Sequence, residues 1–177
     1  MKIICISGHA RAGKDTFATY LKHFLNKNRV NNVLITHYAD LVKYVCRQFF
    51  DWDGNKDEYG RSLLQKVGTD IVRSQDEDYW ARFILDMIKF FPDKWEYVII
   101  PDCRFPNEIK LFRDAGYDVI HIQIIRNNFD NMLTDEQKRH PSETSMEGVV
   151  PDISIQNNGD LENLISSAKM CLGECLL

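Results

Sequence analysis

A chain of 177 residues, 44% hydrophobic and 27% charged, is long enough for one well-packed domain and has the composition of a globular protein. Its formal net charge of -4 argues against a protein that coats nucleic acid, so we expect no nucleic-acid partner. No apolar run reaches membrane-spanning length, and the N-terminal segment meets Gly8 and Arg11 too early for a signal peptide. We therefore expect a cytoplasmic protein with no membrane partner.

The five cysteines show neither a CxxC pair nor a histidine at metal-ligand spacing. We expect reduced, mostly buried thiols and no zinc site. They are Cys5, Cys46, Cys103, Cys171 and Cys175.

The first predicted elements are a strand, a glycine-bearing loop and a helix. The run from Ile3 to Ile6 is typical of a strand buried on both faces, and apolar residues recur at helical spacing from Ala18 onward. Between them, two glycines and a lysine have the spacing of a phosphate-binding P-loop, whose backbone N–H groups and lysine converge on phosphate oxygens. The predicted phosphate-binding residues are Gly8, His9, Ala10, Arg11, Ala12, Gly13, Lys14, Asp15 and Thr16.

Asp15 departs from the usual P-loop pattern, in which a Ser or Thr hydroxyl at this position ligates magnesium. The hydroxyl of Thr16 comes one residue later. Two interpretations stay open: Asp15 ligates magnesium or its water, or it is a partner for residues that bind a second substrate.

A second strand is predicted over residues 33–38, followed by a helix that runs to Phe50. Ligands of open α/β sheets bind at the carboxyl ends of strands, so Asp40 and Lys43 are placed to meet one. Asp40 fits a simple helix cap equally well.

Residues 51–59 are predicted to form a solvated acidic loop, and residues 60–70 a helix interrupted near Gly68. A strongly amphipathic helix is predicted over residues 79–91, with a core face that includes Phe83 and Met87. Trp80, at the start of that helix, is a core residue by its spacing and also a candidate for substrate contact.

The third predicted strand, residues 97–102, ends in Asp102-Cys103-Arg104. An apolar strand that ends in aspartate is the second signature of P-loop proteins, in which the carboxylate holds magnesium, usually through water. Hydrolytic motors often place a glutamate directly after this aspartate, but here a cysteine and an arginine follow. The planar fork of Arg104 suits a clamp on a second anionic substrate.

The remaining pattern is a helix over 106–115, a strand over 119–125 that ends at Arg126, a short strand over 152–156 and a helix from Asp160. Between the last two strands, residues 127–150 are polar and lack any period, which predicts a mobile lid or disorder. We expect an α/β fold: a three-layer α/β/α sandwich with a mainly parallel five-stranded sheet, as in P-loop kinases. Residues 1–177 would form a single domain, with substrate-binding helices at about 40–91 and a lid at about 127–150.

Cations at the strand ends and in the predicted lid indicate that the second substrate, which accepts the transferred group, is itself a phosphate. Its attacking oxygen is largely ionised near neutral pH, so the main task is to align two polyanions in the absence of water. The cations available are Lys14, Arg104, Arg126, Lys138 and Arg139. For Arg126 and Arg139, plain solvated loop charges are the alternative.

Six segments in order, GHARAGKDT, YADLVK, GRSLLQKVGTD, DCRFPNE, HPSE and IQNNG, together resemble the phage-type deoxynucleoside monophosphate kinases. The resemblance implies transfer of the γ-phosphate of ATP to a deoxynucleoside monophosphate, with Mg²⁺ as cofactor. In that family GKD followed by Thr or Ser is usual, so Asp15 is typical of it.

The resemblance also implies roles for particular residues. Residues 8–16 would hold the ATP phosphates, Arg104 would lie near the transferred or acceptor phosphate, the segment 126–143 would act as a lid, and the adenine would lie near Asn157 and Gly159. Apart from the resemblance, the chemistry of the side chains leads us to expect that transfer uses Lys14, Arg104, Arg126 and Arg139, and that Asp15, Thr16 and Asp102 hold magnesium directly or through water. The resemblance further places the acceptor. The monophosphate nucleotide would face Asp40, Lys43, Arg61, Gln65, Thr69, Trp80 and Arg104. A homodimer is left open.

Two other readings compete. Phosphomevalonate kinases of animals share the GKD loop and the arginine after the strand-end aspartate, and dephospho-coenzyme A kinases share the architecture. Aromatic residues available to stack on a base, Tyr38, Trp52 and Trp80, favour a nucleotide acceptor over these. A nucleotide-dependent switch or binding protein is the other alternative, against which stands the missing water-orienting residue.

Overall fold

The computed structural model describes residues 1–127 and 129–173. Its centre is a sheet of five parallel strands in the order β2-β3-β1-β4-β5. The strands are β1 (Lys2–Ser7), β2 (Val33–Ile35), β3 (Tyr97–Ile100), β4 (Asp118–Ile125) and β5 (Ile153–Gln156). The predicted α/β sandwich with a five-stranded sheet is confirmed, and every strand pair is parallel.

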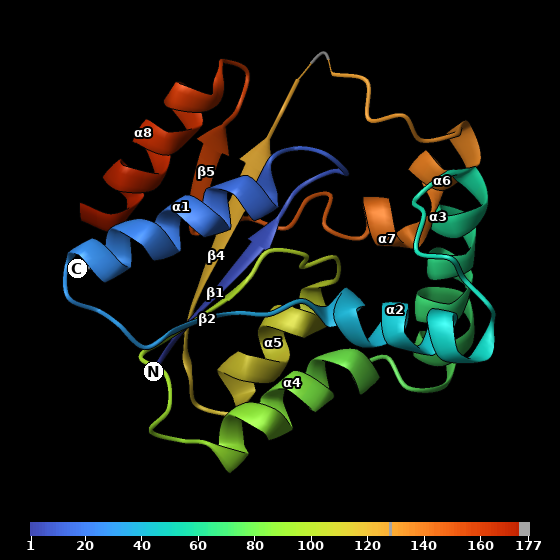
Figure 1. Ribbon diagram of the computed structural model, residues 1–177, viewed down its shortest axis with the longest axis horizontal. Coiled ribbons are helices and arrows are strands. Elements are labelled where there is room, and N and C mark those ends of the chain that lie inside the picture. Colours follow the sequence, from blue (N-terminus) through green and yellow to red (C-terminus); the bar gives the residue numbers. More distant parts are fainter. Residues whose placement is uncertain (128, 174–177) are drawn as a thin grey trace.

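Helices cover both faces of the sheet (Figure 1). On one face lie α1 (Lys14–Lys27) and α8 (Leu161–Cys171), and on the other lie α4 (Tyr79–Phe90) and α5 (Pro106–Asp114). In β1, Ile3 and Cys5 join the core on the α4–α5 face, while Ile4 and Ile6 join the core on the α1–α8 face. All four are fully buried, as a strand with period-two side chains between two helical layers requires.

The other helices lie at the end of the molecule where the strands finish, to the right in Figure 1. They are α2 (Tyr38–Phe49), α3 (Glu58–Gln65), the π-helix η1 (Lys66–Arg73), α6 (Asp135–Arg139) and α7 (Pro141–Thr144). The α-helix predicted over residues 60–70 ends at Gln65, close to the predicted interruption near Gly68, and the chain continues without a break as the π-helix η1. The predicted structureless stretch is wrong for 129–150, which contains α6 and α7.

The helices α6 and α7 are too short to show a hydrophobic period in the sequence, and residues at their starts define them instead. Thr134 and Gln137 form a capping box at the start of α6, and Pro141 occupies the first turn of α7. We name residues 129–150 the lid segment. Asn128, which joins it to the preceding strand, lies outside the described residues.

Several burial predictions were wrong at the margins of the core. Phe83 and Met87 of α4 are 47% and 38% exposed, because its buried face consists of the 80/84/88 stripe with Ala81 and Leu85 beside it. Trp52, in the loop predicted to be solvated, is 4% exposed, packs in the core and lines neither of the two described cavities, so it does not face a ligand there. Four cysteines are buried as expected, and Cys175 lies outside the described residues.

Two observations concern other function classes. Within residues 1–127 and 129–173, no helix is long and apolar enough to cross a membrane. In the same residues no cluster of three or more His, Cys, Asp or Glu side chains is arranged to hold a metal ion.

We predict that Phe112→Ala lowers the free energy of unfolding by about 3–5 kcal/mol, because this ring on α5 is fully buried against the sheet. Phe90→Ala is the matched control, since that ring is 72% exposed and its loss should change stability by about 0.5 kcal/mol or less. Urea unfolding of both variants measures the difference. Equal losses would contradict the assigned core.

Candidate functional site

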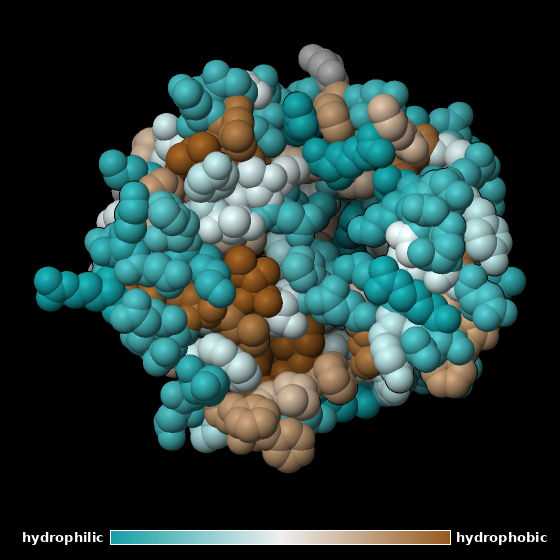
Figure 2. Space-filling view, viewed as in Figure 1, coloured by the Kyte–Doolittle hydropathy of each residue, from teal (hydrophilic) through white to brown (hydrophobic). Residues whose placement is uncertain are grey.

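A cavity of about 470 Å³ lies at the carboxyl ends of the strands between the sheet and the outlying helices. Figure 2 shows the hollow, with hydrophilic side chains around it. Most of the predicted ligand-binding residues meet there although they come from five separate segments. Those that line the cavity are Ala10, Arg11, Lys14, Asp15, Lys43, Arg61, Gln65, Thr69, Trp80, Asp102 and Arg104.

A second cavity of about 230 Å³ lies beside the first. It is lined by Gly8 and His9 of the P-loop and by Arg126 after β4. The two cavities share Arg104, Ser142 and Glu143 as lining residues, so these three residues stand between them. The P-loop also reaches both.

The P-loop is held in a shape that only its glycines permit. Gly13 has φ 99°, and a Cβ there would lie 2.6 Å from the side-chain nitrogen of Asn157. That nitrogen donates to the carbonyl of Ala12 at 2.8 Å, so Asn157 stabilises the conformation of the loop. Its predicted place near an adenine stays a prediction.

Lys14 lies inside the loop, where its Nζ donates to the carbonyls of Gly8 at 2.7 Å and His9 at 2.8 Å. Burial, and after it the positive charge of Arg104, lower the pKa of Lys14 to about 7, although nearby carboxylates act in the opposite direction. An anion that enters the loop would favour the charged form of this amine.

Asp102, at the end of β3, fixes the start of α2. Its two oxygens accept the backbone N–H groups of Tyr38 at 3.0 Å and Ala39 at 2.9 Å, and burial raises the pKa of the carboxyl group. A carboxylate at a helix N-terminus is favourably placed by the helix dipole. Both oxygens are therefore already engaged, and a metal would meet this side chain through water.

His37 links the P-loop to α2. Its Nε2 lies 2.8 Å from Asp15 Oδ1, and its Nδ1 lies 3.4 Å from Asp40 Oδ2. The hydrogen bond with Asp15 raises the pKa of His37 and lowers the pKa of Asp15. Asp40 also accepts from Lys43 Nζ at 2.8 Å. The sequence pattern predicts His37 only as part of a strand over residues 33–38, but β2 ends at Ile35 and His37 is the residue before α2.

The wall of the large cavity away from the P-loop is more apolar. Val42, Leu64 and Trp80 line it. The Trp80 ring is 4% exposed and its Nε1 donates to the carbonyl of Gly68 at 2.8 Å, which fixes the ring's orientation. A flat apolar group could pack against this wall, and the polar residues Arg61 and Thr69 line the same cavity.

Other predicted residues lie at the edge of this arrangement. Arg126 is exposed and its guanidinium lies 4.1 Å from the centre of the Phe129 ring. Arg139, at the end of α6, is exposed and is not among the described residues that line the two cavities. Thr16 and Gly159 are likewise absent from both linings as far as the structure describes them.

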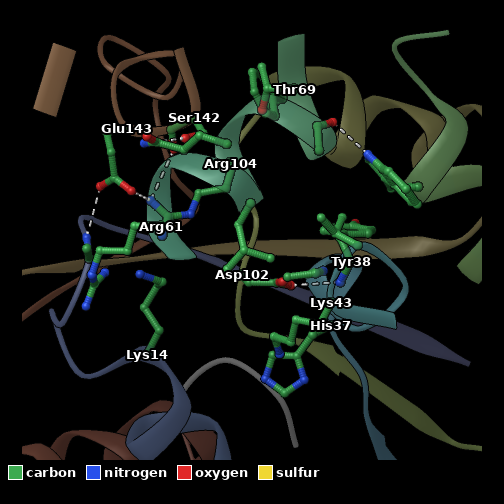
Figure 3. A pocket seen from close by; sticks show the side chains of 18 of the residues that line it. Lys14, His37, Tyr38, Lys43, Arg61, Thr69, Asp102, Arg104, Ser142 and Glu143 are labelled. Carbon is green, nitrogen blue, oxygen red and sulfur yellow. Dashed lines mark hydrogen bonds and ion pairs between the residues drawn. The ribbon is translucent and has the colours of Figure 1, made fainter. Parts of the chain in front are cut away.

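Two carboxylates that the sequence analysis did not single out hold Arg104. Glu108 Oε2 accepts its backbone N–H at 2.7 Å, and burial raises the pKa of Glu108 to about 7. Glu143, on α7, accepts a hydrogen bond from the Arg104 guanidinium (Figure 3). Glu108 belongs to DCRFPNE and Glu143 to HPSE, two of the segments that carry the family resemblance. That membership was the sequence feature from which both residues could have been predicted as part of the site.

Comparison with known proteins agrees with this geometry. The sequence profile of the family described as deoxynucleotide monophosphate kinase matches residues 51–168. The deoxynucleotide monophosphate kinase of Enterobacteria phage T4 is 32% identical over 148 residues, which are 82% of this chain and 55% of that protein. That of Escherichia phage RB69 is 30% identical over 114 residues, 63% of this chain and 44% of that protein. The chain thus spans about half the length of these relatives.

A more distant similarity points to another kinase. The phosphomevalonate kinase of Drosophila melanogaster is 26% identical over 119 residues, 65% of this chain and 61% of that protein.

Solved structures with the same fold are also kinases by name. A sugar kinase from Janibacter sp. HTCC2649 aligns with a TM-score of 0.58 at 14% identity, over 98% of this chain and 95% of that one. The APS kinase CysC of Mycobacterium tuberculosis, in complex with AMPPNP and APS, aligns with a TM-score of 0.53 at 11% identity, over 98% of both chains. These similarities support the P-loop kinase fold. The profile match over residues 51–168, which is most of the sequence, shows that the chain belongs to the deoxynucleotide monophosphate kinase family.

Proposed function

We propose that this protein transfers the γ-phosphate of ATP to a deoxynucleoside monophosphate, giving ADP and the diphosphate. The observation that carries the proposal is the meeting of a P-loop and a large, cation-bearing cavity at Arg104. A volume of about 470 Å³ is within the range for small-molecule sites.

The P-loop would hold the ATP phosphates. Its N–H groups, the start of α1 and Lys14 supply positive potential at one place. The second cavity, which Arg126 lines, continues from the loop and offers room on the donor side. Arg126 there and Arg139 on the lid segment remain candidate cations for the transferred charge.

The acceptor would lie in the large cavity with its phosphate toward Arg104 and its base toward Trp80. Lys43 and Arg61 supply further positive charge along this path, and Gln65 and Thr69 supply hydrogen-bonding groups. A phosphate acceptor is already ionised near neutral pH, so orientation and charge stabilisation are the main requirements. The lid segment contributes Leu133 and Ser142 to the wall and so helps to exclude water.

The described residues include no cluster of side chains that could hold magnesium alone, so the ion would bind together with the nucleotide phosphates. Such an ion commonly binds phosphates, waters and one or two protein oxygens, and it neutralises charge on the transferred group. Asp102 would act through water, and Thr16, which lines neither described cavity, stays a ligand predicted from the sequence alone. Because Asp15 is bonded to His37, we favour its role as a link to the acceptor side.

A phosphomevalonate kinase is the second candidate, favoured by the similarity to the Drosophila enzyme. That acceptor lacks a base and would leave the Trp80 wall without a flat partner. A cytoplasmic location and a homodimer stay predictions from the sequence.

We predict that ADP production depends on an added acceptor and is fastest with a deoxynucleoside monophosphate. A coupled ADP assay with the four deoxynucleoside monophosphates, phosphomevalonate, dephospho-coenzyme A and no acceptor measures this. Equal turnover without acceptor would contradict a kinase, and preference for phosphomevalonate would transfer the proposal to the second candidate.

We predict that ATP binding at pH 8 takes up about one proton, because the pKa of Lys14 near 7 leaves its amine mostly neutral before the polyanion enters. Calorimetry in buffers of different protonation enthalpy gives the number of protons. At pH 6 the uptake should vanish, since Lys14 is then already charged, and Lys14→Met should abolish the uptake at pH 8. A binding enthalpy independent of buffer at pH 8 would contradict the assignment.

We predict that Asp15→Ser raises the acceptor KM about tenfold, the effect of losing one hydrogen bond to a charged group. Magnesium dependence should stay unchanged, because the bond runs to His37 of the acceptor side. His37→Gln should reproduce the same KM effect. A main effect on the magnesium requirement would instead make Asp15 a ligand of the ion or its water.

A further inference from the structure

Glu143 joins three parts of the site through one carboxylate. One oxygen accepts from Arg104 Nη1, and the other accepts the backbone N–H of Ala10 in the P-loop at 3.1 Å (Figure 3). The latter oxygen also lies 4.0 Å from His9 Nδ1. With its side chain 6% exposed, Glu143 connects the lid segment, the end of β3 and the donor loop away from bulk water.

The lid segment that carries Glu143 is docked on the helices of the acceptor side. Gln137 is 3% exposed and its Nε2 donates to the carbonyl of Glu58 and the hydroxyl of Ser62, both at 3.1 Å. Gln65 donates to Ser142 Oγ at 3.4 Å. These bonds run from α3 to α6 and α7, so the position of Glu143 depends on α3.

Arg104 meets the lid segment through a single nitrogen. Its Nη1 donates to the carbonyl of Ser142 at 3.1 Å as well as to Glu143. Nε and Nη2 make no hydrogen bond to the residues that the structure describes, and the side chain lines both cavities. The lid contact therefore fixes the plane of the guanidinium while two of its nitrogens remain available to phosphate oxygens.

We propose that Glu143 is a positioning residue for phosphoryl transfer, which orients Arg104 only when the lid segment is docked. A charge-assisted hydrogen bond in a site shielded from water restricts the torsions of a long side chain strongly. Acceptor binding against α3, lid docking and the orientation of Arg104 are thereby linked. The inference rests on the proposed function, because the transferred group must pass beside Arg104.

Two other roles for Glu143 lead to different results. A carboxylate that only stabilises the fold would affect unfolding and all kinetic constants together. A carboxylate that competes with phosphate for Ala10 and Arg104 would weaken ATP binding, so its neutralisation would make ATP bind more tightly. A positioning residue predicts slower turnover at unchanged ATP affinity.

The test begins with Glu143→Gln, which keeps the shape and removes the charge. We expect kcat to fall about tenfold or more, as misorientation of an essential group does, while the Kd of ATP changes less than about twofold. Glu136→Gln is the matched control, an exposed glutamate of the same lid segment. Glu143→Asp, which keeps the charge but shortens the reach, should also lower kcat and serves if the glutamine variant folds poorly.

The decisive step is to repeat Glu143→Gln in an Arg104→Met background. If Glu143 acts through Arg104, the second substitution should lower kcat by less than about twofold. The same tenfold loss in both backgrounds, tighter ATP binding, or a lowered unfolding temperature with uniform kinetic losses would overturn the proposal.

These assays use whichever acceptor the wild-type protein prefers. A wrong proposed function is therefore recognised from the wild-type acceptor panel, separately from a failure of Glu143 to act through Arg104.

Discussion

Parallel pairing of β1 with β3 on one side and β4 on the other is the constraint on which the site depends. It brings the carboxyl ends of these strands to one edge, so that the P-loop, Arg104 and Arg126 become neighbours despite their separation in sequence. Every other feature of the site is added to this edge. Asp102 fixes α2 there, and the lid segment covers it from the side of α3.

Charge balance explains why this edge suits two polyanions. Lys14 and Arg104 repel each other, which together with burial keeps the pKa of Lys14 low. Carboxylates such as Asp15 and Glu143 offset part of the positive charge without filling the cavity. Phosphate groups from two nucleotides would complete the balance, and their arrival would favour protonated Lys14.

The sheet, the P-loop and the arginine after Asp102 were predictable because each has a local pattern: apolar strands, glycine spacing and a polar residue at a strand end. The contacts of Glu143 and His37 were not, since they join residues 133 and 22 positions apart and leave no periodic signal. The lid helices escaped notice because five- and four-residue helices are defined by caps. Phe83 was assigned to the core because hydrophobic spacing cannot tell a buried stripe from its margin.

The central claim is that ATP and the acceptor bind at the same time, on either side of Arg104, with their phosphates facing each other. An analogue with adenosine and the preferred deoxynucleoside joined through five phosphates tests it most directly, because only such a site can hold both halves at once. We predict competition with both ATP and the acceptor, and binding at least about 100-fold tighter than ATP, since the second half binds at high effective concentration. Competition with ATP alone, at an affinity no better than that of ATP, would contradict the two-substrate site.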